Sequence, residues 1–208
     1  KSIANNFPQV PVVSLNFSGL EKESGFKVTP LMFLKMIYAV LYGDLLMSLY
    51  NQCRPYELVK GSSELVLNKW QTHMKKLFRT GTKYMNTSSL YNRILNDFAE
   101  IKRSKVKKVQ VGIVGEIYVK YSPLANNHLE DFLISEGCEP VVPSLLEFVM
   151  YCAVSTAVDG KLYSFHDKST FLNGIGYKLI YRKQKEMIKI IKKHRVFTPP
   201  HDFEHLRK

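Results

Sequence analysis

Residues 107–143 read KKVQVGIVGEIYVKYSPLANNHLEDFLISEGCEPVVP and contain two short apolar runs separated by a stretch of helix length. The first run, residues 109–114, is typical of a strand that is buried on both faces of a parallel sheet. Asn127 with Glu130 forms a capping pattern, and Gly137 stands where the following helix should end. A second strand is expected at residues 139–142. This order predicts a parallel βαβ unit.

The rest of the chain extends this unit with one more strand and several capped helices. A strand is expected at residues 12–16, near Pro11, and Thr29 followed by Pro30 predicts the start of a long helix. Ser62 or Ser63 should cap the next helix, and Ser144 with Glu147 forms a capping box. Further helices are expected at residues 88–105 and 177–195. We therefore predict an α/β fold, with a Rossmann- or flavodoxin-like parallel sheet, helices on both faces and extra helices, as a single domain over residues 1–208.

Composition restricts the class of protein and its environment. The 208 residues are 45% hydrophobic, enough for a full core, and carry a formal net charge of +12, which attracts polyanions. Much of this charge is concentrated in residues 102–108 and 178–193. Three widely spaced cysteines form no disulfide framework, which favours a reducing, cytoplasmic location. Because the chain begins at Lys1 without Met, we expect it to be part of a larger multidomain protein.

The helix expected after Pro30 is long and very apolar. Its length is close to that of a membrane span, but Lys35, Gly43 and Asp44 would then lie in the hydrocarbon. A buried or interface helix is therefore expected, and no membrane.

Several motifs resemble a known bacterial family. GEIYVKYSPLANNHLEDFL from Gly115, RPYE from Arg54, EGCEPVVPSLLEF from Glu136 and FPQVPVVSLNFSGLE from Phe7 are similar to the dehydratase-like portion of CoA-substrate-specific enzyme activases. That portion is related to 2-hydroxyacyl-CoA dehydratases and benzoyl-CoA reductases. The resemblance implies Rossmann-like domains, CoA-ester substrates, a [4Fe-4S] cluster in catalytic relatives and ATP-driven activation. The ATPase phosphate-binding signatures are missing here, so cluster and ATP are expected in other domains of the parent protein, and none in this fragment.

The loop after the first strand of the βαβ unit is the predicted substrate-binding site. It combines a glycine turn, a carboxylate, a cation, two phenols and a helix N-terminus, which together suit a phosphate or thioester group. Alternatively, the carboxylate caps locally and the tyrosines cover the end of the sheet. The predicted site residues are Gly115, Glu116, Tyr118, Lys120, Tyr121, Asn126 and Asn127.

Other reactive residues offer weaker signals. Arg54 in RPYE either binds an anion or pairs with Glu57 across a turn. Cys53, Cys138 and Cys152 are too scattered to predict cluster ligands, so buried free thiols are expected instead. The histidines lack zinc-site spacing, no metal site is expected, and no catalytic residue can be assigned.

Three functions agree with these patterns. The first is a domain of a dehydratase-related CoA-ester protein that contributes a ligand or partner surface but, as an isolated fragment, no turnover. The second is a structural lobe that docks the ATPase or cluster-bearing domains. The third is a basic nucleic-acid-binding module, for which no reader motif is visible.

Overall fold

The computed structural model describes residues 29–162 and 169–203, and it divides the chain into two compact units, residues 1–36 and 37–208. In the first unit, the described part is the start of helix α2 (Pro30–Cys53). The Thr29 hydroxyl accepts a hydrogen bond from the N–H of Met32 at 3.2 Å, so the predicted helix start is confirmed. Helix α2 continues into the second unit, which holds all the other described elements.

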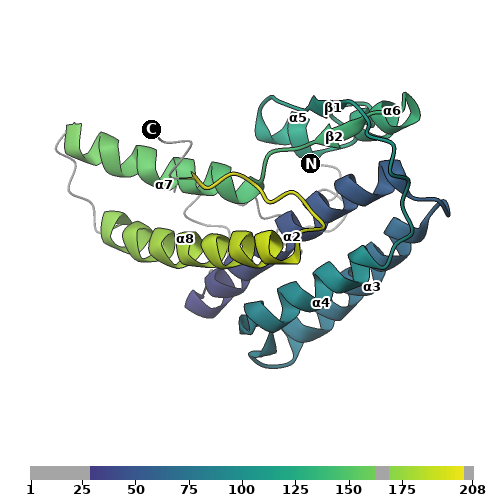
Figure 1. The fold of residues 1–208 in the computed structure, drawn as a ribbon. Coiled ribbons are helices and arrows are strands. Elements are labelled where there is room, and N and C mark those ends of the chain that lie inside the picture. The colour runs from purple at the N-terminus through teal and green to yellow at the C-terminus, as the bar shows by residue number, and fades with distance from the viewer. Residues whose placement is uncertain (1–28, 163–168, 204–208) are drawn as a thin grey trace, which may run out of the picture. The chain divides into compact units, whose positions relative to one another are not determined.

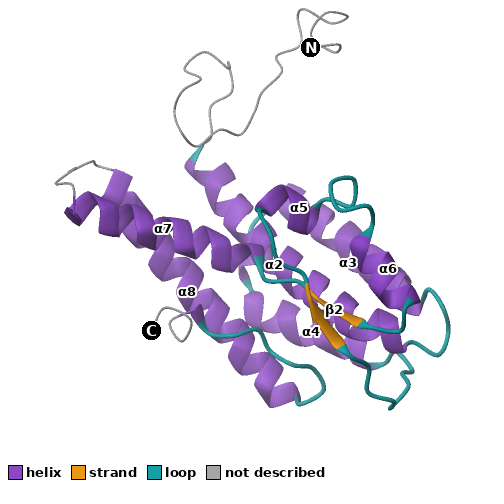
Figure 2. Ribbon diagram, turned by 90° about the horizontal axis from the view of Figure 1, so that it is seen from above, coloured by secondary structure: helices purple, strands orange, loops and turns teal. Residues whose placement is uncertain are grey.

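The second unit is built mainly from helices (Figures 1 and 2). After α2 follow η1 (Arg54–Tyr56), α3 (Ser62–Arg79), η2 (Lys83–Met85), α4 (Thr87–Ala99), β1 (Gln110–Gly112), α5 (Ile117–Tyr121), α6 (Leu129–Ser135), β2 (Glu139–Val141), α7 (Leu145–Leu162) and α8 (Ser169–His194). The structure is 67% helix, and its described part has one sheet of two strands. The prediction of a Rossmann- or flavodoxin-like sheet with helices on both faces is therefore wrong. The strand predicted at residues 12–16 lies outside the described residues.

The pairing within the βαβ segment is as predicted, but its burial is not. Strands β1 and β2 are parallel, with Gln110 opposite Glu139 and Gly112 opposite Val141. However, Val109 is 70% exposed and Val114 is 81% exposed, whereas Ile113 is buried. The expectation of a strand covered on both faces is wrong, because Gln110 and Gly112 of β1 are exposed, Val111 is half-buried, and the valines on either side of the strand face solvent.

Helix α2 supplies the core of the second unit. Tyr38 and Tyr42 recur at helical spacing and are almost fully buried, and the Tyr42 hydroxyl donates to the backbone carbonyl of Tyr84 at 2.6 Å. The Tyr42 ring also packs against those of Phe78 on α3 and Tyr91 on α4. By length and composition, the segment Pro30–Tyr56 would also be able to cross a membrane. The core helix of a soluble protein can meet the same criteria. Within residues 37–53, the apolar stripe of α2 is used for packing.

Helix α8 contacts both α4 and α7. Lys183 donates to Glu186 at 2.9 Å and to the Thr87 hydroxyl at 2.8 Å, which ties α8 to the start of α4. The surface helix predicted at residues 177–195 is confirmed as part of α8, which begins earlier, at Ser169. One of the basic residues that gave α8 its sequence signature, Lys183, therefore helps to anchor the helix.

Candidate functional site

The RPYE tetrapeptide connects elements rather than pairing internally. Arg54 Nη1 donates to Asp131 on α6 at 2.6 Å, and the Tyr56 hydroxyl donates to Glu139 on β2, also at 2.6 Å. Glu57 accepts the backbone N–H groups of Gly61 at 2.6 Å and Ser63 at 2.8 Å, at the start of α3. The predicted Arg54–Glu57 pair is thus replaced by Arg54–Asp131, and the tetrapeptide has a structural role.

The polar residues of the predicted loop mostly satisfy their own backbone. Glu116 accepts the N–H of Val119 at 3.0 Å and caps α5, as the alternative interpretation expected. Asn126 accepts the N–H of Leu129 at 3.2 Å at the start of α6, so it caps this helix in place of Asn127, whose φ is 52°. Asn126 also donates to the carbonyl of Val119 at 3.0 Å, so both side chains are occupied by local backbone groups.

The remaining loop residues separate into two groups. Gly115 adopts a φ of 147°, which permits the turn after β1, and Tyr118 is 58% exposed. Tyr121 donates its hydroxyl to the carbonyl of Pro143 at 2.6 Å, and Lys120 lies over the Tyr121 ring at 5.3 Å. Burial and the nearby Asp44 and Glu147 raise the pKa of Tyr121 to about 12. Lys120 and Tyr121 therefore lie near the carboxylates of Asp44 and Glu147. These two carboxylates line a pocket that no loop residue lines.

The three cysteines differ in how far they are buried. Cys53 is buried, its thiol faces the carbonyl of Phe98 at 3.8 Å, and burial raises its pKa to about 12. Cys138 is half-buried, and Cys152 is exposed, contrary to the expectation that it would be buried. Among the described residues, no group of three or more His, Cys, Asp or Glu side chains could hold a metal ion.

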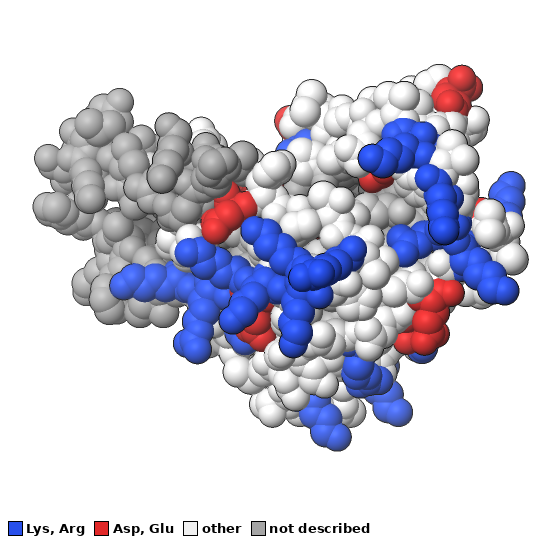
Figure 3. All heavy atoms as spheres, in the orientation of Figure 1, with Lys and Arg blue, Asp and Glu red and all other residues white. Residues whose placement is uncertain are grey.

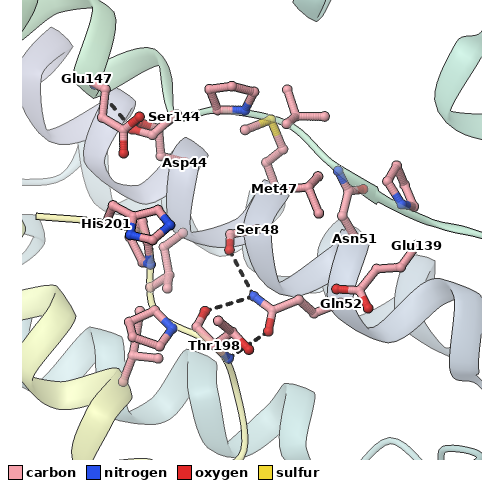
Figure 4. Close-up of a pocket in the computed structure, with 18 of the residues that line it drawn as sticks. Asp44, Met47, Ser48, Asn51, Gln52, Glu139, Ser144, Glu147, Thr198 and His201 are labelled. Carbon is pink, nitrogen blue, oxygen red and sulfur yellow. Dashed lines mark hydrogen bonds between the residues drawn. The ribbon is translucent and has the colours of Figure 1, made fainter. Parts of the chain in front are cut away.

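A pocket of about 390 Å³ opens between α2, the end of β2, α8 and the segment that follows α8 (Figure 4). We call it the apolar pocket, because half of its lining is aliphatic side chains and prolines. These are Leu45, Met47, Pro140, Val141, Val142, Pro143, Met187, Ile191, Pro199 and Pro200. This mixture of apolar surface and polar side chains suits a small-molecule site.

Two carboxylates stand at one end of the apolar pocket. Asp44 accepts the Ser144 hydroxyl at 2.6 Å and the N–H groups of Leu145 and Leu146 at 3.0 and 2.8 Å, so it caps α7 from α2. Burial nevertheless raises the pKa of Asp44. The pKa of Glu147 is raised to about 7 by burial and by the nearby Asp44, against the opposing charge of Lys120. Glu147 can therefore hold or release a proton near neutral pH.

Two amides lie further along the pocket. Asn51 is only 4% exposed, and its Oδ1 has no hydrogen-bond donor. Gln52 donates to Ser48 Oγ and the carbonyl of Thr198, both at 3.1 Å, and accepts the N–H of Thr198 at 2.8 Å. Gln52 thus fixes the segment after α8 against α2, as Figure 4 shows. Asn51 presents a buried acceptor that a ligand N–H could satisfy.

A second pocket of about 430 Å³, which we call the basic pocket, adjoins the first. Arg103, Lys105 and Lys107 line it, and Arg103 is held over the ring of Phe197 at 4.8 Å. The two pockets share Gln52, Gln110, Glu139 and Thr198. We refer to the apolar and basic pockets together as the cleft. It offers aliphatic surface and a protonatable carboxyl group on one side and three cations on the other.

Only partial signals for the cleft are visible in the sequence. Asp44 was a conspicuous charge in an apolar run, and residues 102–108 were a basic segment, but nothing local indicated that they border neighbouring pockets. Comparison of the chain with protein-family models, curated proteins and solved structures found no match.

Proposed function

We propose that this chain binds a CoA ester in the cleft, as a domain of a protein related to the CoA-substrate-specific activases and 2-hydroxyacyl-CoA dehydratases. The observation that carries this proposal is the adjacency of the apolar pocket to the basic pocket through four shared residues. A CoA ester has the corresponding two parts, an acyl chain joined by an amide-containing arm to a phosphorylated nucleotide.

Each part of such a ligand has a matching environment in the cleft. The phosphates would lie against Lys105, Lys107 and Arg103, where charge-assisted contacts to oxyanions are strong. The acyl chain would cover aliphatic surface in the apolar pocket, and an amide N–H of the arm would donate to Asn51 Oδ1. Binding would thus supply a hydrogen-bond donor to Asn51 Oδ1, a buried acceptor that has none in the free protein.

The proposed contribution of this chain is ligand binding and docking, in the cytoplasm, without turnover of its own. ATP hydrolysis and any [4Fe-4S] cluster belong, in this proposal, to other domains of the parent protein. Glu147 is placed to exchange a proton with a ligand in the apolar pocket, but a complete catalytic constellation would need groups from those domains.

Calorimetry with butyryl-CoA tests the proposal. Lys105→Gln/Lys107→Gln should weaken binding at least tenfold, a loss of about 1.4 kcal/mol, because two cations of the basic pocket are removed. The matched control, Lys60→Gln/Lys75→Gln, removes the same charge from exposed positions outside the cleft and should change the affinity less than twofold.

One further arm separates the parts of the ligand. Free CoA should bind more weakly than butyryl-CoA, because the acyl chain no longer covers apolar surface. Equal losses in both double variants, or no binding of butyryl-CoA at millimolar concentration, would remove the ligand proposal. The structural docking lobe would then be the better account.

A further inference from the structure

Helix α8 carries a straight row of cations on one face. Lys178, Arg182, Lys185, Lys189 and Lys192 follow one another at alternating spacings of four and three residues, and all five are exposed. This spacing places them along a single helix face, over about 21 Å at 1.5 Å per residue. Figure 3 shows Lys and Arg side chains gathered over α8. We call these five residues the cationic row.

The cationic row has few acidic neighbours along its own helix. Glu186 is the one acidic residue between positions 178 and 192, and its two carboxylate oxygens are occupied by Thr87 and Lys183, both at 2.9 Å. Like charges at these spacings destabilise a helix by a few tenths of a kcal/mol per pair. Repulsion between neighbouring cations of the row therefore opposes helix formation, and a bound polyanion would relieve it.

The surroundings of the row indicate which kind of anion fits it. Ile180, Met187 and Ile191, on the opposite side of α8, are buried in the protein and unavailable to insert into a lipid surface. Within residues 176–194, where the structure describes the side chains of α8, no large apolar residue is strongly exposed, so this part of the row lacks the apolar anchors of a protein interface, where lysine is depleted. Binding of a phosphate backbone is mainly electrostatic and requires no such anchor.

We propose that the cationic row binds the phosphate backbone of nucleic acid without reading its sequence. The row would lie along the backbone, with each Lys or Arg head facing a phosphate and releasing a condensed counterion. This activity is separate from the CoA-ester cleft, because none of the five residues lines the apolar or the basic pocket.

The test measures binding of a mixed-sequence 16-base-pair DNA duplex by fluorescence anisotropy over a range of salt concentrations. Five phosphate contacts predict a slope of log K against log salt of about −4.5. Lys178→Gln/Lys189→Gln/Lys192→Gln should bring the slope to about −2 and weaken binding at least tenfold at 0.1 M salt. Because glutamine favours helices and the substitutions relieve repulsion, the melting temperature should not fall.

Matched variants and ligands decide the outcome. Lys60→Gln/Lys75→Gln/Lys76→Gln removes the same charge from exposed positions in α3 and just before it, and should weaken duplex binding less than threefold. An equal loss in this control would overturn the proposal in favour of diffuse charge attraction. Tighter binding to polyglutamate, or to vesicles with 30% phosphatidylserine, than to the duplex would overturn it in favour of an acidic protein or a membrane surface. Lys105→Gln/Lys107→Gln should leave duplex binding largely unchanged and so distinguishes this surface from the cleft.

Discussion

Glu147 shows how a single residue acquires a property that its sequence neighbours do not suggest. As expected from the capping box, its backbone N–H donates to Ser144 Oγ, at 3.3 Å. Its side chain, however, lines the apolar pocket near Asp44, a residue that is about 100 positions away in the chain. The resulting rise in pKa depends on this tertiary placement, and local sequence could not reveal it.

The titration of Glu147 should be visible in the stability of the protein. Its pKa is raised from 4.5 to about 7, so its contribution to stability is fully present below about pH 4.5 and is lost as the pH rises through 7. Glu147→Gln keeps the shape of the side chain without the charge. At pH 8.5 we expect the free energy of unfolding of this variant to exceed that of the parent by about 1 to 2 kcal/mol. At pH 5 the two values should be similar.

Denaturant unfolding of both proteins at the two pH values measures this difference. Glu136→Gln replaces an exposed carboxylate outside the pocket and serves as the matched control. If Glu147→Gln behaves like this control, Glu147 is not a protonatable group of the apolar pocket.

At the scale of elements, α3 and α7 are each capped by a carboxylate from beyond their own N-cap residue. Glu57 caps α3 from the turn that precedes it, and Asp44 caps α7 from the middle of α2. The sequence predicted that serines would cap these helices, and Ser144 does so for α7 in part. The positions of the helix starts were predictable because the caps are local patterns, whereas the distant carboxylate partners depend on how the helices pack.

Glu57→Gln tests the cap of α3. Hydrogen bonds from Ser63 and Gly61 lower the pKa of Glu57 despite an opposing effect of burial, so its stabilisation is present above pH 4.5 and is lost at lower pH. We expect the substitution to reduce the free energy of unfolding by about 1 to 2 kcal/mol at pH 7, with a smaller effect at pH 3. Glu64→Gln, in the exposed first turn of the same helix, should cost less than 0.5 kcal/mol, about the scale of an exposed helix-dipole interaction. Equal costs at both positions would mean that the dipole, not the two hydrogen bonds, explains the role of Glu57.

At the scale of the whole molecule, the sequence predicted local units better than their assembly. The parallel pairing of β1 with β2, the end of α6 near Gly137 and the start of α2 at Pro30 follow from short patterns. The larger sheet did not, because a short apolar run such as residues 109–114 does not specify how many strands join it. The cleft was also missed, because its walls come from segments that are distant in sequence.

The distribution of the three cysteines over the molecule bears on the [4Fe-4S] cluster. Because Cys53, Cys138 and Cys152 occupy buried, half-buried and exposed positions, we expect the purified chain to be colourless and to bind no stoichiometric iron. The iron content and the absorbance of the chain are measured after anaerobic reconstitution. A stable cluster spectrum that disappears when any of the three cysteines is replaced by Ser would contradict the assignment of the cluster to other domains.

Hydrogen–deuterium exchange with and without butyryl-CoA tests the central claim, that the cleft holds the ligand. Slower exchange is expected in the segments that line it, residues 44–52, 103–110, 139–147 and 196–201. Exchange in the predicted loop, residues 115–127, should change little, because its capping groups already have partners and none of its residues lines the cleft. Protection confined to residues 115–127, with the cleft segments unaffected, would contradict the account and return the site to the loop.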